Sequence, residues 1–156
     1  MKRNQFMAKR LRELFLDGKW IANTNYKEQL ESVNWKQATH KVASLNTIAA
    51  LTFHVNYYLD GLLQVFRGGP LTISDQYSFD SPPILSEADW QALVATFLDN
   101  ATAFIQHVEN LPDTIFDETF VDVQYGDYWQ NLQVVVEHSY YHLGQLTLLR
   151  KLIVER

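Results

Sequence analysis

The stretch from Gly126 to Arg156, GDYWQNLQVVVEHSYYHLGQLTLLRKLIVER, decides the fold. Apolar residues and histidines recur along it at helical spacing, which predicts one long helix with a buried side. The residues predicted on that side are Leu132, Val135, His138, Ser139, His142, Gln145, Leu146, Leu149, Leu152 and Ile153. Asp127, with Gln130 at the third helical position, is typical of a capping box at the helix start. Two imidazole rings are therefore predicted on the buried side of this helix.

His138 and His142 are four residues apart, so their side chains share one side of the helix. Their Cβ atoms are then about 5 to 6 Å apart, close enough for both rings to bind one ion. A histidine on an apolar helix side is nevertheless more often a core residue hydrogen-bonded to a carbonyl group. The pair alone leaves both interpretations open, and a metal site needs a third ligand.

Composition predicts one globular domain spanning residues 1–156, because 47% of the residues are hydrophobic and the chain is long enough for a sizeable core. The net charge of -5 and the lack of a basic face argue against a nucleic-acid partner. The chain has no cysteine, which removes disulfides, thiolate ligands and a cysteine nucleophile. Any metal must therefore be bound through nitrogen and oxygen.

The sequence predicts neither a targeting segment nor a membrane span. Residues 1–15 lack the continuous apolar core of a signal peptide. The longest apolar stretch, Ile48–Phe66, is interrupted by polar residues at four positions, His54, Asn56, Asp60 and Gln64. We therefore expect a cytoplasmic protein without a membrane partner.

A second long helix is predicted from Ser44 or Asn46 to Arg67, where two glycines and a proline end it. Its predicted buried side consists of Ile48, Leu51, His54, Val55, Tyr58, Leu62 and Val65. Tyr58 is a candidate to line the mouth of a site, as is Tyr141, but its place on the buried side favours core packing. His54 therefore brings a third imidazole into the core from another helix. A buried polar group without a partner costs on the order of 1 to 3 kcal/mol, so three inward histidines favour a shared role.

The remaining pattern completes an all-α four-helix bundle. We predict a first helix over 4–17 with Gly18 as a left-handed cap, a short helix from Asn25 to about Val33, and a third long helix from Ser86 to before Pro112. Residues 34–41 are predicted as a connection with a solvated His40, and 113–125 as an extended segment or hairpin.

Residues 67–85 contain two glycines, three prolines and no period. This composition predicts a long crossover or a lid between the second and third long helices. His107, at the flank of the third long helix, is a weak further ligand candidate.

Three histidines from two facing helices would leave an ion one open position for water or substrate, which favours reactivity over a structural role. Zinc or nickel suits imidazole ligands, and so does iron. Gln145 lies one turn after His142 and is a candidate to orient an imidazole or a metal-bound water, although a bond to a neighbouring helix explains it equally well. Neither histidine-bearing side carries a carboxylate, so no protein general base is predicted.

His54 in the second long helix, followed by HSYYHLGQL from His138, resembles the pattern of the DinB/YfiT-like superfamily. The resemblance covers nearly the whole chain, including the helix count, the long crossover and Trp35 before the second long helix. It implies a four-helix bundle with non-sequential arrangement, often a homodimer, that binds a divalent ion through His54, His138 and His142. Members include S-transferases that use bacillithiol, mycothiol or glutathione, and metal-dependent hydrolases.

Two functional hypotheses follow. The first is a metal-dependent enzyme that directs a low-molecular-weight thiol or a water at a small electrophilic molecule. The alternative is a non-catalytic, stress-related binding module whose metal site is structural or vestigial. A pocket that reaches the histidines and is walled by residues 68–85 would favour the enzyme, whereas a sealed site would favour the module.

Overall fold

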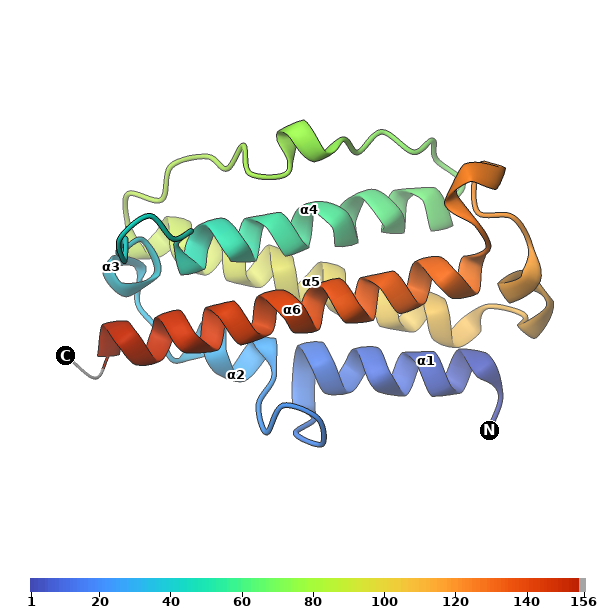
Figure 1. Cartoon of the computed structure of the whole chain (residues 1–156), viewed down its shortest axis with the longest axis horizontal. Helices are drawn as coiled ribbons and strands as arrows, with labels where there is room; N and C mark the ends of the chain where they lie inside the picture. Colours follow the sequence, from blue (N-terminus) through green and yellow to red (C-terminus); the bar gives the residue numbers. More distant parts are fainter. Residues whose placement is uncertain (155–156) are drawn as a thin grey trace.

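Four long helical segments pack side by side as a bundle (Figure 1). The structure is a computed structural model that describes residues 1–154. Its α-helices over that range are α1 (Arg3–Arg12), α2 (Tyr26–Glu31), α3 (Trp35–Ala38), α4 (Ile48–Phe66), α5 (Glu87–Asn110) and α6 (Tyr128–Val154). The all-α bundle predicted from the sequence is confirmed, and residues 155 and 156 of the predicted last helix lie outside the described range.

The core lies where α5 meets α1, α2 and α4. Trp90, Phe97 and Phe104 on one side of α5 are fully buried, as their helical spacing predicts. The ring of Phe97 lies 5.8 Å from that of Phe15 and 5.1 Å from that of Tyr26. These rings hold α5 against α2 and the turn Glu13–Asp17, while the ring of Phe104 lies 5.2 Å from that of Phe66 in α4.

Side-chain caps set the starts of the helices. The predicted caps Asn25, Ser86 and Asp127 accept hydrogen bonds from backbone N–H groups three residues later, at 2.9, 3.1 and 2.7 Å. The start predicted for α4 is wrong by a few residues. Thr47 is the cap, accepting from the Ala50 N–H at 3.0 Å.

Three further local predictions are corrected. Residues 34–41 contain the short helix α3, held by a capping box in which Asn34 and Gln37 exchange two hydrogen bonds of 3.0 Å. Gly18 has an extended backbone (φ -97°) after a π-helical turn over Glu13–Asp17, so it is no left-handed cap. Leu152, predicted as buried, is 40% exposed near the end of α6.

The segment between α5 and α6 is also different from its prediction. It forms two 3-10 turns, Asp113–Asp117 and Val123–Tyr125, rather than a hairpin. A single antiparallel bridge between Thr119 and Asp127 is the one β contact in the described residues. The turns place Phe120 and Tyr125 beside the start of α6, where they form one end of the pocket described below.

The crossover, residues 67–86, runs back along α4 to the start of α5 (Figure 1). The Tyr57 hydroxyl donates to the Ser74 carbonyl at 3.1 Å and accepts from the Ser74 N–H at 2.9 Å. Ile73 packs against Gly61 so closely that a Cβ at Gly61 would overlap the Ile73 side chain. The crossover is therefore fixed against α4 over the turns that follow His54.

Within residues 1–154, no helix combines the length and the apolar character needed to span a lipid bilayer.

Candidate metal centre

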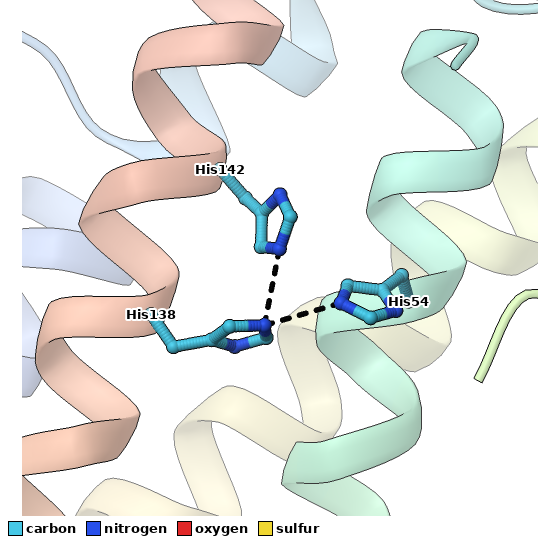
Figure 2. Close-up of side chains that lie close together, drawn as sticks. All are labelled: His54, His138 and His142. Atoms are coloured by element: carbon cyan, nitrogen blue, oxygen red, sulfur yellow. Dashed lines mark hydrogen bonds between the residues drawn. The ribbon is translucent and has the colours of Figure 1, made fainter. Parts of the chain in front are cut away.

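His54, His138 and His142 converge on one point between α4 and α6 (Figure 2). The His138 Nε2 atom lies 3.1 Å from Nε2 of His54 and 3.0 Å from Nε2 of His142. One ligand atom from each ring lies within 4.8 Å of the other two. The structure therefore brings together the three histidines that helical spacing placed on buried helix sides.

Hydrogen bonds on the far side of two rings decide where their protons lie. The Nδ1 atom of His54 is 3.3 Å from the Ser78 carbonyl oxygen, and Nδ1 of His142 is 2.7 Å from Gln145 Oε1. Both oxygens can only accept, so both Nδ1 atoms carry hydrogen and each neutral ring keeps its Nε2 lone pair. Gln145 is itself held, since its Nε2 donates to the Tyr141 hydroxyl at 3.1 Å. Two lone pairs therefore point at the space between the helices.

Burial keeps the three rings neutral. It is the largest cause that lowers the pKa of each histidine below the usual value, and with the other nearby groups it gives His138 a pKa of about 4. The neighbouring imidazoles lower the pKa of His138 and His54 further, while the bonds to Ser78 and Gln145 oppose the shift in their own partners. At neutral pH the rings are uncharged, which is the form that binds metal ions.

The arrangement fits a divalent ion better than it fits a hydrogen-bonded core. The Nε2 lone pairs of His54 and His142 both face His138 Nε2, which carries at most one hydrogen in a neutral ring and can satisfy one of them. A cation satisfies all three nitrogens at once. Two nitrogens on one tetrahedral zinc ion are about 3.3 Å apart, close to the observed 3.0 and 3.1 Å.

Aromatic rings surround the histidines. Phe79 stacks on His54 with centroids 4.1 Å apart and planes at 11°. Tyr58 presents its ring at 5.2 Å to both His54 and His138, and its hydroxyl donates to Asp75 Oδ1 at 2.6 Å. Burial and this hydrogen bond raise the pKa of Tyr58, so its hydroxyl keeps its proton. The interpretation of Tyr58 as core packing is therefore wrong, because the side chain is half-buried beside the site.

Sequence reasoning missed Asp75, Ser78 and Phe79. They lie in the aperiodic crossover, where no regular spacing predicts which side chains turn toward the bundle. Gly61, the one glycine in α4, is the sequence feature that marks a close approach of another segment.

A pocket of about 430 Å³ lies against the His138 side of the cluster. Its wall includes His138, Tyr58 and Ser139, and the crossover contributes Leu71, Ile73, Ser74 and Asp75. His54 and His142 do not line it and are only 6% and 7% exposed. The histidines are therefore reached from the pocket through His138.

The two remaining histidines, His40 and His107, lie outside the cluster. His40 is exposed, as predicted. His107 stacks on Phe66 at 5.3 Å with planes at 5°, and Phe66 is twelve residues after His54, about 18 Å along α4.

Comparison with known protein families identifies a match to the DinB superfamily over residues 24–146. That range contains α2, α3, α4, α5 and the part of α6 that carries His138, His142 and Gln145. Searches of curated proteins and of solved structures returned no significant match. Because the family match covers well over half of the 156 residues and includes the whole histidine cluster, the chain belongs to the DinB superfamily.

Proposed function

We propose that the chain is a metal-dependent enzyme in which His54, His138 and His142 bind a divalent ion beside a substrate pocket. One observation carries this proposal: the 430 Å³ pocket is lined by His138 and walled by the crossover. Structural metal sites are usually closed by protein ligands, so a cavity of that size beside one ligand favours a catalytic site. The imidazole set suits zinc or nickel, and also iron.

A bound ion would supply a Lewis acid that stabilises negative charge on a water, a thiol or a substrate atom. The protein's own residues hold and shield that position. Ser78 and Gln145 fix the rings of His54 and His142 through their Nδ1 hydrogens. Phe79 covers His54 from solvent, and Tyr58 places a protonated hydroxyl at the boundary between the histidines and the pocket.

The nucleophile that we propose comes from outside the chain. There is no cysteine, and the carboxylate in the pocket wall, Asp75, is engaged by Tyr58. We therefore propose transfer of a low-molecular-weight thiol, or hydrolysis, with a small electrophilic molecule as substrate. In the transfer, a bond forms from sulfur to the electrophilic carbon, the bond to the leaving group breaks, and the thiol proton ends on the leaving group or in solvent.

The alternative is a non-catalytic binding module with a structural metal site. Its support is that Phe79 seals His54 and that His138 alone of the three ligands reaches the pocket. Cobalt substitution separates the two proposals, because visible absorption of cobalt changes when an outside ligand binds it. A spectrum that a small thiol leaves unchanged would favour the module.

The primary test is metal content followed by activity. We expect about one divalent ion per purified chain by elemental analysis, and loss of that ion in His54→Ala and His138→Ala. His40→Ala replaces an exposed histidine and is the matched control. Thiol-transfer and hydrolysis assays should then lose activity on chelation and regain it on metal return. Activity that survives complete removal of the ion would refute the proposal.

The same proposal includes one domain over residues 1–156, a homodimer and a cytoplasmic location. Light scattering on the purified protein measures the oligomeric state directly, and a monomer would remove the dimer from the proposal without affecting the site.

A further inference from the structure

Most of the wall of the 430 Å³ pocket is apolar. Residues from four segments contribute aliphatic or aromatic surface, including Leu59, Leu62, Leu71, Ile73, Val134 and Phe120. The volume lies within the usual range of small-molecule sites, about 300 to 1,000 Å³. Each ligand methylene buried against such a wall adds to the free energy of binding. The wall therefore favours a ligand with an apolar body.

Several polar groups of the wall are already hydrogen-bonded within the protein. The Tyr58 hydroxyl donates to Asp75, and the Ser74 N–H donates to Tyr57. The Asn131 amide donates to the carbonyls of Tyr125 and Asp127, both at 2.8 Å. A charged group on the body of a ligand would lose its hydration and meet few free partners in exchange.

The charged residues of the wall also favour an uncharged ligand. Among the described residues that line the pocket, Asp75 is the one carboxylate and there is no lysine or arginine. A ligand carboxylate in the pocket would be repelled by Asp75 and would find no lysine or arginine in the wall to pair with. Carboxylate-rich thiols such as glutathione therefore match the wall poorly.

We propose that this pocket selects a small molecule with an uncharged, apolar body, whose one polar or reactive group lies at the His138 and Tyr58 end. This selectivity rests on the proposed function for the role of the reactive group, but the pocket binds the apolar body whether or not the site turns over. Where a thiol is used, it is an apolar thiol, or its charged portion stays outside the pocket.

The test is competition between two thiols of equal chain length. N-phenyl-1-naphthylamine, a neutral probe that fluoresces in apolar surroundings, is bound to the protein as purified and to the chelator-treated protein. Hexane-1-thiol and 6-mercaptohexanoate then displace it. Both have a thiol for the histidine end, and only the second has a charged far end. We expect hexane-1-thiol to displace the probe at a concentration lower by at least about tenfold in both preparations.

Two variants locate the effect in this pocket. Asp75→Asn keeps an acceptor for the Tyr58 hydroxyl and removes the charge, so it should improve binding of 6-mercaptohexanoate by at least about fivefold and change hexane-1-thiol less than about twofold. Asp80→Asn, in the same crossover but outside the wall, is its control. Leu62→Trp fills part of the pocket with a larger side chain and should lower the affinity for the probe by at least about tenfold.

Equal displacement by the two thiols, in either preparation, would overturn the inference. So would failure of the probe and hexane-1-thiol to bind the wild-type protein. Metal content and turnover are measured on the same samples. Apolar selectivity without metal-dependent turnover would refute the proposed function alone, whereas metal-dependent turnover with no preference between the thiols would refute this inference alone.

Discussion

Two oxygen atoms outside the proposed coordination sphere fix the orientation of two of the histidine rings. The Ser78 carbonyl and the Gln145 side chain accept from the Nδ1 atoms of His54 and His142, so the opposite nitrogens are free to bind. Such partners orient a ring and raise its basicity, and their loss typically lowers metal affinity about 10- to 100-fold. Of the two, only Gln145 acts through its side chain, so it can be tested by substitution.

Gln145→Ala should therefore weaken zinc binding by about 10- to 100-fold, because the His142 ring loses the acceptor at 2.7 Å that fixes its orientation. Affinity is measured by competition with a chromophoric chelator. Gln133→Ala removes an exposed glutamine from the same helix and should leave affinity unchanged. Equal affinities in Gln145→Ala and the wild type would show that the glutamine has no such role.

The lowered pKa values of the three histidines predict acid sensitivity of the metal-free protein. In the unfolded chain a histidine protonates near pH 6.5, whereas in the folded protein His138 stays neutral down to about 4. Between these values the unfolded state binds more protons, so the free energy of unfolding falls as the pH falls from about 6.5 toward 4. Urea titrations should show this decline. It should be shallower in His138→Gln and unchanged in His40→Gln.

At the level of elements, the contact between α4 and the crossover places both Ser78 and the pocket wall. Gly61 makes this contact possible, because Ile73 occupies the space that a Cβ would need. Phe79 and Asp75 follow in the same segment, one stacked on His54 and the other bonded to Tyr58. A substitution at Gly61 that displaces the crossover should therefore also displace Phe79 and Asp75 beside the histidine cluster, although Gly61 is not part of the cluster.

The same substitution at two helical glycines should have opposite effects. Gly61→Ala should destabilise the protein by about 1 to 3 kcal/mol, since the rigid Ile73 side chain must move with the crossover. Gly144→Ala in α6 meets no atom within 4 Å and should stabilise by about 0.5 to 1 kcal/mol, because alanine is the better helix former. Chemical denaturation measures both. A stabilising Gly61→Ala would show that the crossover is loosely held.

Sequence periodicity predicted the long amphipathic helices. It failed for short elements and for segments whose conformation depends on contacts with distant parts of the chain. The histidine-bearing sides of α4 and α6 followed from spacing alone. In contrast, α3 has four residues and depends on one capping box, and the turn over Asp113–Asp117 depends on contacts with α1 and α6. The Ser78 bond to His54 joins residues 24 apart across an aperiodic segment, so no local pattern could reveal it.

For the whole molecule, the histidine cluster joins parts of the chain that are far apart in sequence. His54 and His138 are 84 residues apart, and an ion between them would tie α4 to α6. Another long-range contact ties α6 to α2, the bond from the buried Tyr26 hydroxyl to the Ser139 carbonyl at 2.7 Å. An ion that binds only the folded arrangement would stabilise it by mass action.

Zinc at about 100 times its dissociation constant should therefore add about 2.7 kcal/mol and raise the melting temperature by about 5 to 10 °C. Unfolding should stay a single transition if residues 1–156 form one domain. Differential scanning calorimetry measures both quantities. His54→Ala should abolish the zinc-dependent increase and His40→Ala should keep it. An equal increase in all three proteins would place the zinc elsewhere.

The crossover also offers a route to redesign. Because Leu71, Ile73 and Asp75 belong to a connection rather than to a helix of the bundle, they can be exchanged without rebuilding the helical framework. A library confined to these positions, with Gly61, Ser78 and the histidines kept, would alter which molecules are admitted while leaving the reactive end constant. Under the proposed function, such a library would vary the pocket wall while the groups that hold the ion stay the same.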